Sequence, residues 1–191
     1  MQETASTRPN PSRGRRQNVE WSEREKAAWQ PPERLTVSEW ADERRIMDSK
    51  SSAFPGKWRT DRTPYLREIM DQFSNPEVED ITLCTGTQVG KTEVINNIVG
   101  YCIDQDPNPA LIVYPTLTLA EFSSENRIEP MILQVPQLAE KYDKRASDRL
   151  ELQFPGMYLA LSGANSPASL ASRPVRYVFF DEVDKFPDNS G

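Results

Sequence analysis

Hydrophobic positions after residue 80 alternate between strand-like runs and helix-like faces. Short apolar runs occupy residues 80–84, 110–115, 157–163 and 175–180, and each ends near a polar or proline residue. Residues 91–105 and 118–133 instead space their apolar side chains for one face of a helix, which in the first segment consists of Val94, Ile95, Ile98, Val99 and Cys102. This alternation predicts an α/β fold in which a parallel sheet is flanked by helices.

The pattern before residue 80 favours short helices separated by loops. Residues 20–30 mix tryptophans with charges and predict a short helix, which Pro31 and Pro32 would end. A second helix is expected to open near Thr36, with Ser38 as a candidate cap, and a third over 64–76. Loops are expected over 51–65 and 136–156, and a turn or short helix over 166–172.

These patterns divide the chain into three predicted parts. Residues 1–34 form a flexible basic arm, because residues 1–19 carry four arginines against one acid and almost no apolar side chain. Residues 35–79 form a helical lead-in, and residues 80–191 an α/β core. The arm has two open interpretations, a solubilising tail or a segment that contacts DNA or a partner.

Composition narrows the classes of protein. The sequence has no histidine, which excludes Ser-His-Asp catalysis and His-ligated zinc within these 191 residues. No apolar run approaches the ~20 residues of a membrane-spanning helix. Cys84 and Cys102 stand among apolar residues and predict reduced core thiols. A net charge of −6 argues against a generally basic nucleic-acid coat but leaves room for a local basic groove.

The stretch CTGTQVGKTE at 84–93 ends in the Gly-Lys-Thr of a phosphate-binding loop. The pattern G-x-x-x-x-G-K-[ST] expects glycine where this chain has Thr85, and the glycine comes one place later, at Gly86. A displaced entrance leaves the phosphate end untouched. We therefore expect nucleotide binding by Gly86, Thr87, Gln88, Val89, Gly90, Lys91 and Thr92, with Lys91 on the phosphates and the Thr92 hydroxyl on Mg²⁺.

A second motif follows about ninety residues later. The apolar run ending RYVFF leads directly into Asp181 and Glu182. An acid at the tip of a buried strand holds the magnesium shell in nucleotide hydrolases, so Asp181 is the predicted metal partner. Glu182 is the predicted catalytic residue that orients and polarises the attacking water. A plain strand capped by two acids would give the same letters, but its coincidence with the loop favours the catalytic interpretation.

Together these residues resemble a known family. The chain is similar to the ATPase end of the large terminase subunit of tailed phages, in the lambda-like branch, from about Leu35 to Phe186. The resemblance rests on LTVSEWADERR, PGKWRTDRTPYLREIMD, TGTQVGKTE, VYPT, RIEPMI, SGANSPASLASRP and VFFDEVDKF. It implies a P-loop NTPase of the ASCE or RecA-like type with an N-terminal helical and disordered extension, incomplete at its C-terminus.

The resemblance also implies chemistry and partners. ATP and Mg²⁺ would be the cofactors, and the motor would move double-stranded DNA into a procapsid. Partners would be the terminase small subunit and the portal protein of the procapsid, with a homo-oligomeric ring in the full-length protein, in the host cytoplasm and without a membrane. Tyr65 falls where the family holds adenine, although it is equally compatible with a core residue. Arg173 or Arg127 would supply an arginine finger, unless each forms a simple salt bridge. A nuclease would lie beyond Gly191.

Two alternatives stay open from the sequence. Asp181 to Asp184 form a D-E-x-D box, and YPTLTLA is similar to a segment of superfamily-2 helicases, whose ATPase core has the same chemistry. A nucleotide-binding scaffold without turnover is the non-enzymatic alternative. The second acid, Glu182, argues against it, because binding alone does not need that carboxylate.

Overall fold

The structure is a computed structural model that describes residues 21–22, 24–25, 34–49, 54–166 and 173–188. The chain divides into two compact units, Met1–Glu33 and Arg34–Gly191. The predicted arm over 1–19 and most of the predicted turn over 166–172 lie outside the described residues. The architecture below is that of the second unit.

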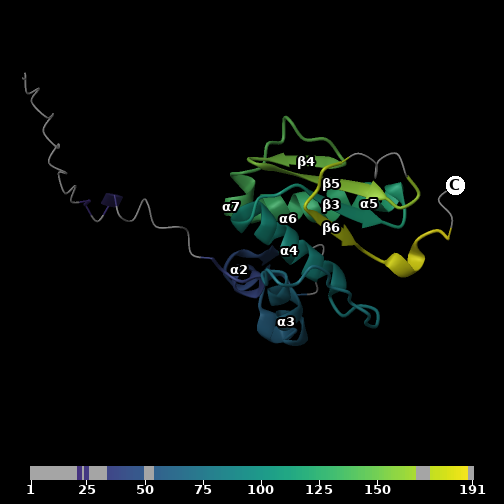
Figure 1. Cartoon of the computed structure of the whole chain (residues 1–191), viewed down its shortest axis with the longest axis horizontal. Coiled ribbons are helices and arrows are strands. Elements are labelled where there is room, and N and C mark those ends of the chain that lie inside the picture. Colours follow the sequence, from purple (N-terminus) through teal and green to yellow (C-terminus); the bar gives the residue numbers. More distant parts are fainter. Residues whose placement is uncertain (1–20, 23, 26–33, 50–53, 167–172, 189–191) are drawn as a thin grey trace, which may run out of the picture. The chain divides into compact units, whose positions relative to one another are not determined.

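A four-stranded, mostly parallel sheet forms the centre of this unit (Figure 1). Its strand order is β4 (Glu151–Phe154), β5 (Met157–Gly163), β3 (Ala110–Tyr114) and β6 (Tyr177–Phe180). β3 pairs in parallel with both β5 and β6, and β4 pairs antiparallel with β5. The predicted mixed α/β architecture with a parallel sheet is thus confirmed in its main features.

β4 is a strand where the sequence predicted a loop. It forms a hairpin with β5 through a turn at Gly156, whose φ of 79° favours glycine. Its residues alternate between half-buried polar side chains and the buried Leu152 and Phe154. Four residues are too short an alternation to stand out within a charged region, and pairing with β5 supplies the stability that the local sequence lacks.

The helices cover one face of the sheet with the main apolar core. α4 (Lys91–Gln105) has the predicted bounds. The predicted helix over 118–133 is three consecutive pieces, α5 (Leu117–Ser123), the π-helical η2 (Ser124–Ile128) and α6 (Glu129–Gln134), and α7 (Pro136–Ala139) follows. Pro130 stands at the start of α6 and lacks the N–H that a continuous α-helix needs, which accounts for the change of helix type.

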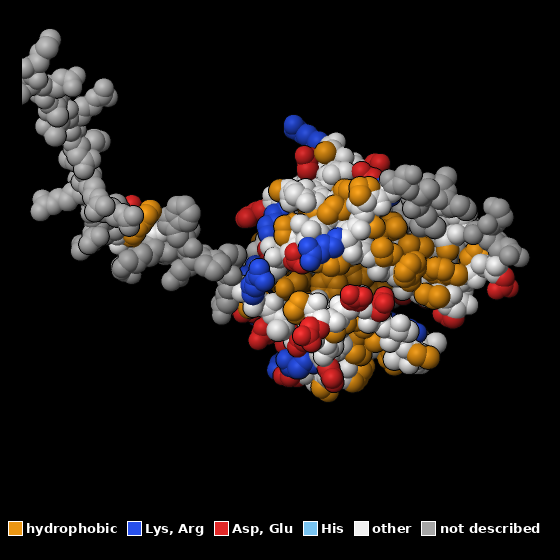
Figure 2. All heavy atoms as spheres, in the orientation of Figure 1, with side chains coloured by type: hydrophobic (Ala, Val, Ile, Leu, Met, Phe, Trp, Pro, Cys, Tyr) orange, Lys and Arg blue, Asp and Glu red, His pale blue; other side chains and the backbone are white. Residues whose placement is uncertain are grey.

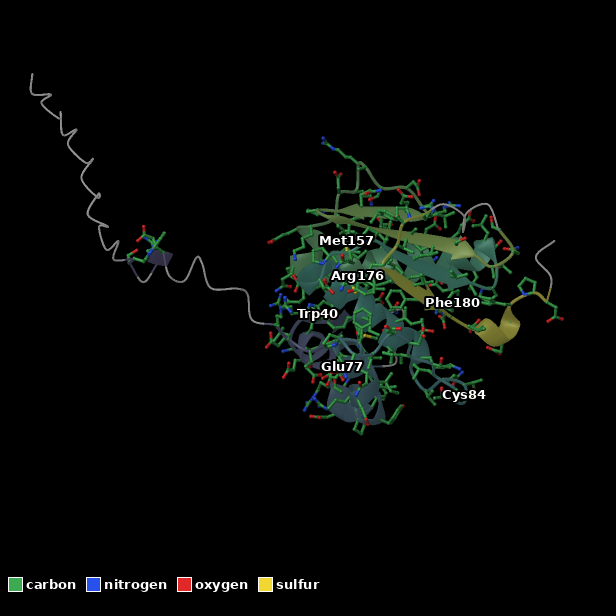
Figure 3. The ribbon with its side chains drawn as sticks, in the orientation of Figure 1. Trp40, Glu77, Cys84, Met157, Arg176 and Phe180 are labelled. Atoms are coloured by element: carbon green, nitrogen blue, oxygen red, sulfur yellow. The ribbon has the colours of Figure 1, made fainter. Side chains whose placement is uncertain are left out.

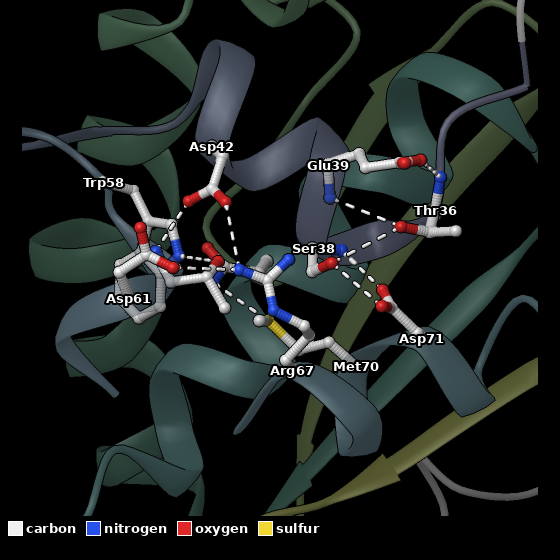
Figure 4. Close-up of polar contacts among 11 residues, drawn as sticks. Thr36, Ser38, Glu39, Asp42, Trp58, Asp61, Arg67, Met70 and Asp71 are labelled. Atoms are coloured by element: carbon white, nitrogen blue, oxygen red, sulfur yellow. Dashed lines mark hydrogen bonds and ion pairs between the residues drawn. The ribbon is translucent and has the colours of Figure 1, made fainter. Parts of the chain in front are cut away.

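The lead-in packs against α4. It consists of α2 (Val37–Arg44), the short antiparallel pair β1 (Ile46–Met47) and β2 (Gly56–Lys57), η1 (Thr60–Arg62) and α3 (Tyr65–Gln72). Thr36, not Ser38, caps α2, because it forms a capping box with Glu39. Ser38 instead donates its backbone N–H and its hydroxyl to the carboxylate of Asp71 at 2.9 Å each, which ties α2 to α3 (Figure 4).

Trp40 joins α2 to α4 (Figure 3). Its ring is fully buried, and a Cβ added at Gly100 would lie only 2.2 Å from it. Its indole Nε1 donates to the Asp104 carboxylate at 2.9 Å. The same carboxylate also accepts from Lys141 at 2.8 Å and from Arg44. Gly100 therefore permits a close crossing of α2 and α4, and the buried Asp104 carboxylate has hydrogen-bond donors around it.

The predicted strand over 80–84 is wrong, since residues 78–86 have no regular secondary structure. A strand needs a neighbour to pair with, and none of the described strands pairs with this segment. The outer edge of β6 is likewise unpaired among the described residues, and its Val178 and Phe180 side chains are exposed. Figure 2 shows hydrophobic side chains gathered on the face around this part of the sheet. Within the described residues, no helix is long and apolar enough to cross a membrane.

Candidate active site

The start of α4 and the end of β6 meet at one hydrogen bond. The Thr92 hydroxyl donates to Oδ2 of Asp181 over 3.0 Å, although 89 residues separate the two in sequence. Asp181 follows β6 directly, and its N–H donates to the Val113 carbonyl at 3.1 Å, which extends the ladder to β3 by one residue. The two predicted magnesium partners are therefore side by side.

Asp181 is only 5% exposed. Burial raises the pKa of its carboxyl above the usual range, and the nearby Glu182 acts in the same direction. The hydrogen bond from Thr92 and the charge of Arg127 oppose that rise in the pKa. A buried acid whose charge is disfavoured by its surroundings is well suited to receive a cation.

The loop before α4 is held by its glycine and its lysine. Gly90 has φ of 91°, which favours glycine, and a Cβ built there would crowd the Leu66 side chain at 3.1 Å. The Lys91 ammonium donates to the Thr85 carbonyl at 3.4 Å and closes the loop on itself. Gln88 also adopts a positive φ, of 57°.

The displaced entrance glycine has a simple account. A Cβ at Gly86 would meet no atom within 4 Å, and neither Thr85 nor Gly86 has a positive φ. Residues other than glycine can therefore adopt the backbone conformation at the start of the loop, whereas the positive φ at Gly90 favours glycine. Residues 85–88 are all exposed.

Tyr65 lies beside this loop at the first residue of α3. Its hydroxyl donates to the Val89 carbonyl at 3.2 Å, and the residue is 56% exposed. The alternative of a core tyrosine is therefore wrong. An exposed ring next to the loop is a surface on which a planar base can stack, and the stacking itself stays a prediction.

Glu182 occupies a strained position beside an open groove. Its φ of 56° and ψ of 45° lie in the left-handed region, which is uncommon for a residue other than glycine, and its carboxylate accepts from Lys185 at 2.9 Å. The groove has a volume of about 630 Å³ and is lined by Pro115, Thr116, Thr118, Leu119, Phe122, Glu182 and Lys185. The sequence identified Glu182 but did not indicate Lys185 or the groove, because only the fold brings α5 next to the segment after β6.

The two candidate arginines differ in their surroundings. Arg173 forms an ion pair with Glu151 on β4, and this agrees with its interpretation as a simple salt-bridge residue. Arg127 lies exposed in η2, and its charge lowers the pKa of Asp181. Arg127 forms no ion pair with any described residue. Of the two, only Arg127 contributes to the pKa of Asp181, and the role of an arginine finger stays a prediction for both.

The oxygens present suit magnesium. No group of three or more Asp, Glu, Cys or His side chains that could hold a metal occurs in the described part of the chain. Mg²⁺ typically takes one or two protein oxygens and fills its remaining positions with water and substrate phosphates. The Thr92 hydroxyl and the Asp181 carboxylate match that habit, so the residues fit this cofactor.

The two cysteines are not alike. Cys102 is buried in α4, as predicted, and burial raises the pKa of its thiol. Cys84 is exposed, contrary to the prediction of a core thiol (Figure 3). The strand that would have buried it does not form, so its neighbours Ile81 and Leu83 give no cover.

Comparison with known proteins identifies the family of the chain. The family described as "Phage terminase large subunit gpA, ATPase domain" matches residues 52–191. The chain belongs to this terminase ATPase family. It is also 27% identical over 164 residues to the terminase large subunit of Enterobacteria phage P21, an alignment that covers 82% of this chain and 25% of that protein.

The family match bears on the alternatives left by the sequence. The matched residues include the predicted phosphate loop, Asp181 and Glu182. The terminase interpretation is therefore favoured over the helicase, and an ATPase domain over a scaffold without turnover. The chain spans about a quarter of the length of the P21 relative, so the activities of a whole terminase are taken up as proposals below.

Proposed function

We propose that this chain is the ATP-hydrolysing part of a phage terminase large subunit that packages double-stranded DNA. The observation that carries the proposal is the Thr92–Asp181 hydrogen bond at the mouth of a glycine-closed loop, in a chain of the terminase ATPase family. In a P-loop NTPase of the ASCE type, a hydroxyl at the start of the loop helix and an acid after a neighbouring strand hold one magnesium ion between them.

Each loop residue has a defined task in this proposal. Residues 86–90 present backbone N–H groups to the phosphates, and the N-terminus of α4 adds its dipole. Lys91 leaves the Thr85 carbonyl and reaches the β- and γ-phosphates. Thr92 and Asp181 hold Mg²⁺, whose charge offsets that of the phosphates when it is bound.

Glu182 acts on the attacking water. Its carboxylate accepts a proton from the water, whose oxygen attacks the γ-phosphorus as the bond to the β-phosphate oxygen breaks, which leaves ADP and phosphate. This role requires that the carboxylate exchange its ion pair with Lys185 for a hydrogen bond to water. Arg127 is placed to stabilise the developing charge, and Tyr65 to stack on adenine.

The wider assignment follows from the family. Duplex DNA, a small subunit, the portal protein of a procapsid and further copies in a ring are the proposed partners, in the host cytoplasm. Cutting of DNA is assigned to a separate domain, because the acids of this site are committed to the nucleotide.

The test is nucleotide binding by Lys91→Ala, measured by calorimetry with MgATP. A charge-assisted contact to phosphate is typically worth ~2–4 kcal/mol in such sites, so binding should weaken by one to three orders of magnitude. Lys144→Ala is a suitable control, because Lys144 pairs with Glu129, outside the site. Unchanged affinity in a folded Lys91→Ala protein would contradict the proposal.

A further inference from the structure

Arg45 is a buried arginine next to the predicted phosphate loop. It is 4% exposed and follows the last residue of α2. Its guanidinium donates to Oε2 of Glu93 at 3.0 Å and to the Ile46 carbonyl at 2.7 Å. Its Nε is buried and has no hydrogen-bond partner among the described residues. Burying such a cation is costly, so the position calls for an explanation beyond packing.

Glu93 gives that explanation. It is the third residue of α4 and follows Lys91 and Thr92 directly, so its carboxylate lies within the first turn of the helix. An acid there stabilises an empty helix N-terminus. The same acid repels the phosphates that a nucleotide would bring to this terminus, and this repulsion is stronger at a partly buried site than in water.

We infer that Arg45 is a positioning residue for the phosphate loop. The arginine neutralises the charge of Glu93, so that the first turn of α4 can accept a polyanion. The inference rests on the proposed nucleotide site and adds to it a residue outside the loop and the acid pair. It assigns no contact between Arg45 and the nucleotide, since the arginine acts through Glu93.

The backbone around Arg45 is well anchored for this role. Its N–H donates to the Ala41 carbonyl at 3.0 Å, and its own carbonyl accepts from the Trp58 N–H at 2.9 Å. Trp40 fixes the same helix against Gly100, further along α4. The guanidinium is therefore carried by a braced segment, and Glu93, whose second oxygen accepts from Asn96, is held from both sides.

The experiment compares Arg45→Met, Glu93→Gln and the double variant by calorimetry with MgADP. If Arg45 compensates the charge of Glu93, the two single variants should change the affinity for MgADP in opposite directions. Arg45→Met should weaken binding about threefold to tenfold, Glu93→Gln should strengthen it by a similar factor, and the double variant should bind like the wild type. Higher salt should reduce both differences, because added ions screen the charges.

A purely structural role gives a different pattern. Both single variants would then weaken binding, or neither would change it, and either result overturns the inference. If Arg45→Met does not fold, Arg45→Lys should keep nearly the wild-type affinity, and the tighter binding of Glu93→Gln decides by itself. Arg44→Met is the matched control, because Arg44 pairs with Asp104 in the last turn of α4. It should lower stability without changing affinity.

Lys91→Ala separates this inference from the proposed function. If Lys91→Ala binds MgADP as the wild type does, the loop is not the nucleotide site and the proposed function fails. If Lys91→Ala loses binding while the Arg45 and Glu93 variants do not differ from the wild type, only the inference about Arg45 fails.

Discussion

At the residue scale, Asp181 combines a buried carboxyl with a proposed role in holding a cation. Its pKa is raised in the folded protein, chiefly by burial, above the 3.8 of an unperturbed aspartate. A raised pKa means that the folded chain binds this proton more tightly than the unfolded chain. The ionised carboxylate therefore destabilises the folded state, and this cost disappears as the pH falls through the raised pKa.

Asp181→Asn should accordingly be at least as stable as the wild type near pH 7, while it loses binding of magnesium nucleotide. Melting temperatures across about pH 4–8 would check this, and the advantage of the variant should shrink toward the acid end. A variant that melts well below the wild type at neutral pH would show that the Thr92 hydrogen bond stabilises the fold more than burial destabilises it.

Glu182→Gln tests the other acid. The amide keeps the size and most hydrogen bonding but cannot accept the proton from water, so turnover of ATP should fall ~10²-fold or more while nucleotide binding persists. Phosphate release under single-turnover conditions is the measurement. Lys144→Met serves as the control and should retain hydrolysis, because Lys144 pairs with Glu129, outside the site. Wild-type turnover by Glu182→Gln would place the catalytic role elsewhere.

At the element scale, the crossing of α2 and α4 depends on the absence of a side chain at Gly100. A methyl group there would overlap the buried Trp40 ring, and the two helices would have to separate. Gly100→Ala should destabilise the protein by roughly 1–3 kcal/mol, despite the better helix propensity of alanine. Denaturant unfolding would measure this loss. Gly86→Ala is the contrasting variant, since its Cβ would meet open space and stability should hardly change.

How well the sequence predicted each element depends on what stabilises it. α4 and β5 have the predicted bounds, because a long apolar face and a continuous apolar run specify them locally. β4 was missed and the strand over 80–84 wrongly predicted, because both depend on whether another strand lies alongside. Predictions of strands from local pattern fail at such positions.

The same distinction applies to the site. Thr92 and Asp181 were predicted from two local motifs, the Gly-Lys-Thr of a phosphate loop and an apolar run that ends in acids. The fold brings the two side chains together. Arg45 carried no signal, because a lone arginine after a helix has many possible partners and only the packing of α2 on α4 selects Glu93. Residues that act through another side chain are the ones that a single sequence conceals.

At the scale of the whole molecule, the division at residues 33 and 34 makes a simple prediction. Residues 1–19 belong to the first unit and carry almost no apolar side chain, so their deletion should remove no residue of the core of the second unit. The melting temperature should shift by less than about 2 °C, by calorimetry or circular dichroism. A large loss of stability would mean that these residues pack into the ATPase body.

The two cysteines differ in exposure, so one of them can be labelled selectively in the native protein. Cys84 is exposed directly before the predicted phosphate loop, whereas Cys102 is buried and its raised pKa keeps it as an unreactive thiol. A maleimide dye should therefore attach to the native protein at one position only, and the second thiol should react once the chain is unfolded. Because the attached dye would adjoin residues 85–92, its fluorescence should respond when MgATP enters, which offers an optical assay that needs no engineered cysteine.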